Sequence, residues 1–372
     1  MAVSDAGRTS YVGAVTVTNR RPGEVAPARL VAQRIAGPRT TTPAEAVRWL
    51  TAVQAQDYAG ALTSVALRTR TRLRSEVVAA LDSGDIVRSW PMRGTLHLTS
   101  GEDLPWMLRL LAPRVIKGSV ARRVGLGLDE PQLEQARELT VAALSGGRRM
   151  RRADLLASWD EAGLDPSGQR GVHILRYLAM TGTVVFGPTA PAGEQLLVLL
   201  DEWVPQPRHL ERDEALCELA VRYFRSHGPA LAADLAGWSG LTVGDTRTAV
   251  TLARPALATW DIDGAEYLLD PQTPDRLAVA GASAAGVFLL PGFDEFLLGY
   301  RDRSAQLDPA DSHRIVPGGN GVFRPTVVSA GRVVGTWTRP SRGARQAFAA
   351  TPFHEFSPHV ESVLAELYAA LP

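Results

Sequence analysis

The 372-residue chain has one cysteine, Cys217, and one lysine, Lys117. A single cysteine excludes an intrachain disulfide, which is typical of proteins in the reducing cytoplasm, where we expect this protein. Long hydrophobic runs are missing as well, because no apolar stretch reaches the roughly 18 residues that a membrane-spanning helix needs. The sequence therefore predicts a protein with neither a disulfide framework nor a membrane segment.

The first 26 residues also lack the apolar segment of a secretory signal, and we interpret residues 1–26 as a flexible extension. Beyond them the composition is that of a folded protein, since hydrophobic residues make up 45% of the chain and charged residues 21%. This balance excludes a mainly disordered chain, and the length predicts two or three domains.

The net charge is only +1, which by itself indicates no partner, but the basic residues are unevenly distributed. Residues 61–123 contain eleven basic and five acidic side chains, and a second basic run follows at residues 148–152. A chain that is neutral overall and basic along one segment can hold a polyanion on one face. For any single arginine, a solvated surface position is the simpler interpretation.

The same order of elements recurs three times: helices, a turn, another helix and two strands. In the clearest copy, helical spacing covers residues 214–226, and two shorter helices precede strands that flank Asp263-Gly264, a tight hairpin signal. A second copy covers residues 130–200, and a less regular first copy begins at the capping box of Thr42 and Glu45. Three helices followed by a hairpin predict a winged helix, so we predict three in tandem.

From residue 286 onward, short strand-like segments alternate with glycine-rich turns, which favours a small β-rich unit resembling a partial barrel, and residues 357–371 predict a terminal helix. The predicted fold class is α+β. The predicted segments are a flexible extension (1–26), three winged-helix units (27–128, 129–210 and 211–285), a β-rich unit (286–345) and a C-terminal segment with its helix (346–372).

Signatures of common cofactors and hydrolases are missing from the sequence. The seven histidines are scattered without metal-ligand spacing, and no glycine-rich dinucleotide motif follows a strand. The glycine turn at residues 317–321 lacks the lysine of a phosphate-binding loop, and no Gly-x-Ser-x-Gly elbow occurs. We therefore expect no metal and no cofactor, and neither nucleotide hydrolysis nor serine hydrolase chemistry.

The first candidate site is Gln54-Ala55-Gln56, which lies where the capped helix ends. In an extended segment residues two apart point the same way, so Gln54 and Gln56 could direct two amides into one pocket. The simpler interpretation is a helix end with its glutamines in water. A second candidate is Arg93 with His97 in the hairpin of the first unit, with Arg88 upstream, where the alternative is an ordinary edge strand.

The third candidate is the segment of residues 293–303, in which Asp294 and Glu295 stand among aromatic residues. Two carboxylates in such a setting could serve as general acid and base. We favour the other interpretation, in which aspartate and arginine side chains form a network that holds the β-rich unit together.

Four motifs then stand in order: Gln54-Ala55-Gln56, residues 90–98 (WPMRGTLHL), residues 291–300 (PGFDEFLLGY) and residues 316–325 (VPGGNGVFRP). With these motifs the sequence resembles the bacterial winged-helix DNA glycosylases related to the azinomycin-resistance enzyme, over roughly residues 28–337. The resemblance implies three winged helices and a β-barrel in a C shape around a DNA channel. It also implies that Gln54 and Gln56 catalyse excision of alkylated purines from double-stranded DNA, including unhooking of interstrand crosslinks in antibiotic self-resistance.

The chemistry of glutamine is consistent with that activity. Guanine alkylated at N7 already carries a positive charge, so its glycosidic bond needs little acid assistance when the base leaves. Glutamine does not titrate, but its carbonyl can accept from a water and its amide can donate to sugar or phosphate, and such oriented dipoles accelerate reactions. Because Lys117 lies among arginines that suit phosphate contact, we expect a monofunctional enzyme that forms no Schiff base and leaves an intact abasic site.

We expect basic side chains to contact the DNA backbone, because phosphate contacts position a protein on the duplex. The predicted contacts are Arg88, Arg93, Lys117, Arg122, Arg123, Arg148, Arg149, Arg151 and Arg152. A monomer is expected for this architecture.

Two other functions stay open from the sequence. A winged-helix transcription regulator would explain the repeats and the basic segments without catalysis, and would prefer one DNA sequence. A drug-sequestering resistance protein would bind the alkylating compound itself in a pocket lined by Trp90, Trp106 and Trp159.

Overall fold

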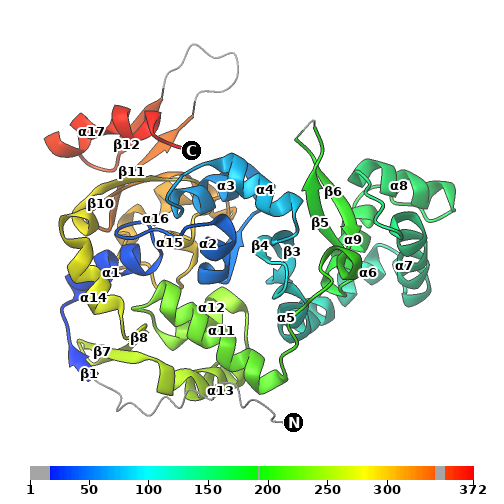
Figure 1. Cartoon of the computed structure of the whole chain (residues 1–372), viewed down its shortest axis with the longest axis horizontal. Coiled ribbons are helices and arrows are strands. Elements are labelled where there is room, and N and C mark those ends of the chain that lie inside the picture. Colours follow the sequence, from blue (N-terminus) through cyan, green and yellow to red (C-terminus); the bar gives the residue numbers. More distant parts are fainter. Residues whose placement is uncertain (1–16, 192, 340–347) are drawn as a thin grey trace, which may run out of the picture.

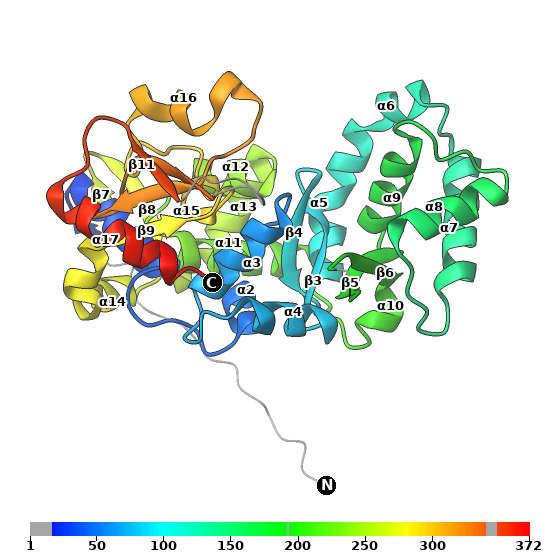
Figure 2. The same ribbon diagram turned by 90° about the horizontal axis from the view of Figure 1, so that it is seen from above.

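The fold comes from a computed structural model, which describes residues 17–191, 193–339 and 348–372. Figures 1 and 2 show an elongated molecule with a helical lobe at one end and a sheet covered by a helix at the other. The helical lobe contains α7 (Glu130–Leu144), α8 (Arg152–Glu161) and α9 (Arg170–Met180), and the covering helix is α17 (Pro358–Ala369). Within the described residues no helix is long and apolar enough to cross a membrane.

One five-stranded sheet runs through the first two predicted units, in the order β2-β4-β3-β5-β6, where β2 is Ala52–Gln54. In the first unit three helices precede a hairpin: α2 (Pro43–Leu50), α3 (Tyr58–Leu67), α4 (Arg74–Asp82), β3 (Ile86–Met92) and β4 (Thr95–Ser100). In the second unit α7, α8 and α9 precede β5 (Val184–Thr189) and β6 (Gln195–Leu199). The hairpins join where Arg88 pairs with Phe186. The predicted border at residue 128 therefore does not separate two independent sheets.

The second unit is built around an apolar core that its amphipathic helices supply. Leu155 and Trp159 of α8 and Ile174 and Leu178 of α9 are fully buried in one cluster with strands β5 and β6. Two helices that the sequence did not predict, α5 (Leu104–Gly118) and α6 (Val120–Gly125), connect this unit to the first. Helix α5 packs against β3, so the two units share a core as well as a sheet.

The third unit has the predicted helices and hairpin: α11 (Arg212–His227), α12 (Ala232–Ser239), α13 (Val243–Ala253), β7 (Ala258–Ile262) and β8 (Ala265–Leu269). Asp263 and Gly264 both take positive φ in the turn between the strands, as the hairpin signal predicts. The unit also includes β1 (Val17–Asn19), which pairs in parallel with β7, and α1 (Val25–Ala32), which is largely buried. The folded part thus begins within the predicted extension of residues 1–26, and residues 1–16 lie outside the described part.

The last unit is an open four-stranded sheet in the order β12-β11-β10-β9. Its strands are β9 (Val287–Leu290), β10 (Thr326–Ser329), β11 (Arg332–Thr338) and β12 (Ala349–Pro352). Among the described residues β9 and β12 are the unpaired edges of an open sheet, and β12 lies beyond the predicted border at residue 345. Helix α17 packs on this sheet through Val360 and Leu364.

Candidate active site

The glutamine motif lies on an edge strand of the five-stranded sheet. Helix α2 ends at Leu50, and Thr51 takes a positive φ of 71°, which turns the chain into β2 (Ala52–Gln54). Gln54 pairs with His97 of β4 in an antiparallel register. The motif is therefore extended and is not the solvated helix end of the simpler interpretation.

The two glutamines come together but differ in exposure. The Gln56 N–H donates to Gln54 Oε1 at 3.0 Å, and the Leu96 N–H lies 3.5 Å from Gln56 Oε1. Gln54 is 6% exposed, whereas Gln56 is open to solvent. No described protein group accepts from either side-chain NH2, so both amides keep donors that a substrate can use.

Two charged side chains hold the backbone of the motif from different directions. Glu295 Oε1 accepts from the Gln54 N–H at 2.8 Å, and Arg88 Nε donates to the Ala55 carbonyl at 3.0 Å. The Ala55 N–H in turn donates to the Leu96 carbonyl at 2.8 Å. Hydrogen bonds to charged groups are about twice as strong as neutral ones, so the backbone that carries both amides is firmly positioned.

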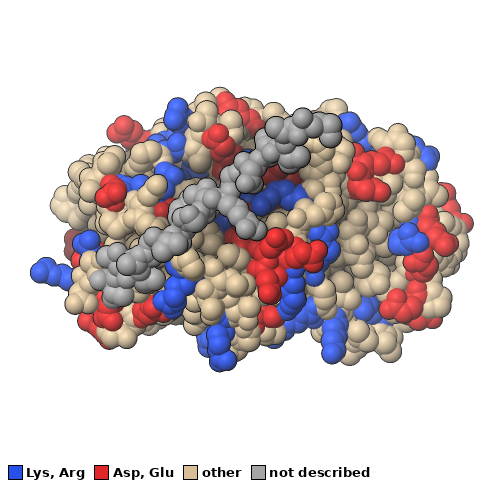
Figure 3. Space-filling model, turned by 60° about the horizontal axis from the view of Figure 1, so that its bottom comes forward, with Lys and Arg blue, Asp and Glu red and all other residues tan. Residues whose placement is uncertain are grey.

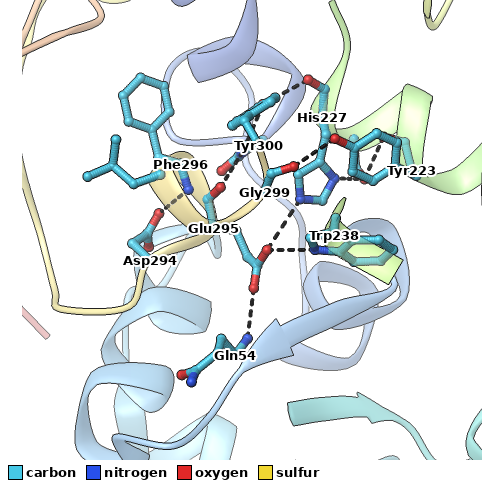
Figure 4. A network of polar contacts seen from close by, with 12 residues as sticks. Gln54, Tyr223, His227, Trp238, Asp294, Glu295, Phe296, Gly299 and Tyr300 are labelled. Atoms are coloured by element: carbon cyan, nitrogen blue, oxygen red, sulfur yellow. Dashed lines mark hydrogen bonds and ion pairs between the residues drawn. The ribbon is translucent and has the colours of Figure 1, made fainter. Parts of the chain in front are cut away.

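Glu295 is fully buried at the first turn of α15 (Glu295–Leu298), where three other elements meet it (Figure 4). Trp238 Nε1 donates to Glu295 Oε2 at 3.0 Å, and His227 Nε2 lies 3.5 Å from the same oxygen. Burial raises the pKa of Glu295, but the hydrogen bond and charge of His227, with smaller contributions from His97 and the Gln54 N–H, lower it to about 2. The carboxylate therefore stays ionised and acts as a fixed acceptor for Gln54.

Asp294, the other carboxylate of this segment, is held in a buried ion pair. Arg68 Nη1 and Nη2 donate to its two oxygens at 2.9 Å each, and Ser64 Oγ donates to Oδ2 at 2.6 Å. Arg68 has no exposed surface and also donates to the Gln33 backbone and side chain. These contacts support the structural interpretation of Asp294 and Glu295 over the acid–base one, although the partner is Arg68, the residue that caps the C-terminus of α3, and not an arginine of the same segment.

Arg93 is bound inside the protein, which differs from the predicted phosphate contact. It takes a positive φ in the turn between β3 and β4, and its Nη2 lies 3.3 Å from His97 Nε2. Burial and the charge of Arg93 lower the pKa of His97 to about 4, so the ring is neutral at neutral pH. His97 Nδ1 lies 2.9 Å from the Thr95 carbonyl, which places the ring proton on Nδ1 and lets Nε2 accept from Arg93.

Two more of the predicted DNA contacts are occupied by protein groups. Arg123 is 5% exposed and donates to the Ile116 carbonyl at 3.0 Å and to Ser119 Oγ at 2.8 Å, so little of its guanidinium is left for the predicted phosphate contact. Arg88 binds the motif and also donates to Gln195 Oε1 at 2.9 Å, and burial lowers its pKa to about 10. Both arginines fix neighbouring elements.

The other predicted contacts lie at the surface but form two separate groups. Lys117, Arg122, Arg148, Arg149 and Arg151 are exposed, and Arg152 is half-buried. The first group, Lys117 and Arg122, lies on α5 and α6. The run of residues 148–152 lies beside α10 (Leu200–Trp203), because the Gly146 N–H donates to Glu202 of that helix. Figure 2 shows α6 and α10 at opposite edges of the lobe, so the two groups do not form one patch.

Two arginines near Asp57, Arg74 and Arg339, were not predicted from the sequence. A cavity of about 190 Å³ lies beside the motif. Asp57, the residue after Gln56, lines it together with Trp337, Arg339 and other residues. Burial lowers the pKa of Arg74, the charge of Arg339 lowers it further, and Asp57 raises it, so these charges lie near one another. Arginines alternate with other residues over residues 68–74, but that spacing does not tell which of them reaches the motif.

The tryptophan pocket of the drug-sequestering alternative does not form. Trp106 and Trp159 are each about 1% exposed or less and belong to different apolar cores, and Trp90 packs at the edge of the second of them. Three buried or half-buried rings in this arrangement leave no common binding surface. Over the described residues no cluster of three or more His, Cys, Asp or Glu side chains has a metal-binding arrangement.

Comparison with known proteins agrees with this architecture. A family model described as DNA glycosylase AlkZ-like matches residues 47–371. The chain is 28% identical over 324 residues to the interstrand DNA cross-link repair glycosylase of Streptomyces sahachiroi, which covers 81% of this chain and 83% of that protein. The structure is similar to the solved structure of the Streptomyces sahachiroi DNA glycosylase AlkZ, with a TM-score of 0.79 and 25% sequence identity over 95% of this chain and 97% of that one. The chain therefore belongs to the AlkZ-like DNA glycosylase family.

Proposed function

We propose that this protein is a monofunctional DNA glycosylase that hydrolyses the N-glycosidic bond of N7-alkylated purines and leaves an abasic site. We extend the proposal to the unhooking of interstrand crosslinks, because the relative from Streptomyces sahachiroi is named for cross-link repair. The observation that carries the proposal is the contact between Gln54 and Gln56 on a backbone that buried Glu295 and Arg88 hold in place.

The reaction that suits this arrangement needs dipoles and no titrating base. An N7-alkylated guanine leaves as a neutral base, so the barrier lies in stabilising the positively charged sugar and directing a water to it. The carbonyl of Gln54 has a second lone pair for that water beside its bond from the Gln56 N–H. The free NH2 groups of Gln54 and Gln56 can donate to sugar or phosphate oxygens. Losing one such oriented group costs on the order of 100-fold in rate.

DNA would be bound by the repeated units. Each consists of three helices and a hairpin, the order of a winged helix, and we propose that they enclose a channel for the duplex. Arg339 lines a cavity together with Asp57, the residue that follows Gln56, and would supply positive charge beside the motif. Lys117, Arg122 and the run of residues 148–152 remain proposed contacts farther along the DNA backbone.

The test is incubation with a duplex that carries a single N7-methylguanine, followed by heating in alkali, which breaks the strand at an abasic site. We expect breakage at the lesion only after alkali, with the rate reduced on the order of 100-fold in Gln54→Ala and in Gln56→Ala. A transcription regulator would give no abasic product. Breakage without alkali that is lost in Lys117→Ala would contradict the monofunctional mechanism.

A further inference from the structure

A cavity of about 540 Å³ lies between α2, the loop of residues 34–41 that precedes it, and α11. Neither glutamine of the motif lines it. Five of its lining residues are arginines and two are glutamates. Those arginines are Arg34, Arg39, Arg48, Arg222 and Arg225. A concave site with this excess of guanidinium groups has the character of an anion-binding site.

Two of the five arginines are already neutralised. Arg48 pairs with Glu102 at 2.9 Å, and Arg222 pairs with Asp103 at 2.6 Å and with Glu218 at 2.7 Å. The two lining glutamates are occupied as well, since Glu218 binds Arg222 and Glu45 accepts from the backbone N–H groups of Thr41 and Thr42. The cavity therefore has no spare carboxylate for its other three arginines.

Those three arginines, Arg34, Arg39 and Arg225, have no carboxylate within 4.0 Å among the described residues. Each is half-buried. Arg39 Nε donates to the Leu67 carbonyl at 3.0 Å. Arg34 Nη1 donates to the Pro38 carbonyl at 3.4 Å and its guanidinium lies over the Trp49 ring, while its Nε is buried without a partner. Arg225 makes no described hydrogen bond. Partly desolvated cations that face one cavity without a paired carboxylate raise the free energy of the empty site.

The lowered pKa values of two of these arginines also indicate an excess of positive charge at the cavity. Burial lowers the pKa of Arg39, and the charge of Arg72 lowers it further. Burial also lowers the pKa of Arg34, the nearby Arg276 lowers it further, and Asp270 opposes part of this effect. An anion in the cavity would reverse these effects, because opposite charge favours the protonated guanidinium.

We propose that this cavity binds a small phosphate-bearing molecule, held by Arg34, Arg39 and Arg225. Planar guanidinium groups match phosphate oxygens in pairs, and the volume suits a ligand of nucleotide size. An extended duplex fits less well, because a cavity of about 540 Å³ cannot enclose it. Figure 3 shows one face of the molecule, on which basic side chains lie in a hollow with acidic side chains beside it. The proposal is independent of the glycosylase activity.

The test is titration calorimetry of the full chain with ADP, pyrophosphate, inorganic phosphate and adenosine. We expect ADP and pyrophosphate to bind with a Kd below about 1 mM, and adenosine not to bind. A tighter Kd for ADP than for pyrophosphate would identify a nucleotide ligand, and equal values would identify a free phosphate compound. Arg225→Ala and Arg39→Ala should each weaken binding at least about tenfold, since each removes charge-assisted hydrogen bonds.

The matched control is Arg247→Ala, which removes an exposed arginine of α13 that does not line the cavity. It should bind ADP like the unchanged protein, and all three variants should keep their melting temperature and their activity on N7-methylguanine DNA. Absence of ADP and pyrophosphate binding at millimolar concentration, equal binding of adenosine, or insensitivity to both substitutions would overturn the proposal. Loss of duplex affinity in Arg225→Ala without any binding of the small phosphates would overturn it in favour of a DNA contact.

Discussion

The first and second units have the same order of helices and strands but place their charged side chains differently. In the first unit Arg68 is fully buried and pairs with Asp294, and Gln54 is fixed by the equally buried Glu295. In the second unit Arg151 and Asp154 form an exposed ion pair, and the interior around Trp159 is apolar. The same architecture is thus stabilised by a buried polar network in one copy and by apolar packing in the other.

This difference shows where the protein positions its reactive groups. Exposed ion pairs contribute little because water and salt screen them, whereas a buried charge has a large effect on its neighbours when its partner is removed. The buried network of the first unit ends at the backbone of Gln54, and the second unit has no counterpart there among its described contacts. We therefore expect substitutions of charge to act strongly in the first unit and weakly in the second.

The largest expected effect is a loss of stability in the variant Arg68→Ala. The substitution leaves Asp294 buried without its partner, and we expect the free energy of unfolding to fall by about 3–5 kcal/mol. Arg151→Ala is the matched control in the second unit, where an exposed pair predicts a loss of at most about 1 kcal/mol. Urea unfolding of both variants measures the difference, and equal losses would break the comparison between the units.

The next largest expected effect is a lower rate of catalysis in the variant Glu295→Gln. The substitution keeps an acceptor near the Gln54 N–H but removes the charge that His227 and Trp238 surround. We expect the single-turnover rate on N7-methylguanine DNA to fall about tenfold, less than the loss of a catalytic dipole. Duplex affinity measured in parallel should be unchanged, and a rate equal to that of the unchanged protein would remove Glu295 from the positioning role.

A third effect is the dependence of stability on pH. The pKa of Glu295 is lowered to about 2 in the folded protein, so its contribution is present above the ordinary glutamate pKa and is lost as the pH falls toward 2. We expect the free energy of unfolding to decrease between pH 5 and pH 3 by up to about 1.4 kcal/mol per pH unit more than in Glu295→Gln. Parallel slopes for the two proteins would show that Glu295 titrates normally.

The smallest effect concerns the exposed cations of the lobe. If Arg149 or Lys117 contacts a phosphate, replacing it with alanine should reduce the slope of log K against log salt concentration by about one unit and leave stability unchanged. The run of residues 148–152 and the pair Lys117 and Arg122 lie on different edges of the lobe, so the two groups can be tested separately. A group whose variants all keep the original slope does not touch DNA.

The sequence predicted some elements closely and missed others. Helices α8 and α13 were predicted almost to the residue, because turn and cap residues mark their neighbourhood: Gly146-Gly147 precede α8, and Thr242 caps α13, which ends before Pro255. Helix α3 was missed, because Gly60 to Leu67 are all buried and no amphipathic period remains to be recognised. The parallel pairing of β1 with β7 was not predicted, because a strand of three residues is too short to show an alternation of apolar and polar side chains.

The candidate site was only partly predictable for a related reason. The glutamine pair could be recognised from its motif, and the structure brings its two members together. The groups that hold it, Glu295 and Arg88, are distant in sequence, and Arg88 was taken for a DNA contact because an arginine near a hairpin looks the same whether it faces solvent or protein. Burial decides between the two, and burial of a charged side chain depends on elements that meet only in the folded chain.

The most direct test of this account is a double-mutant cycle of Glu295→Gln with Gln54→Ala, measured as single-turnover excision of N7-methylguanine. If Glu295 acts through the Gln54 backbone, the double variant should be as slow as Gln54→Ala alone, because the positioned group is already gone. Rate losses that multiply in the double variant would contradict the account, since Glu295 would then act on the reaction independently of Gln54.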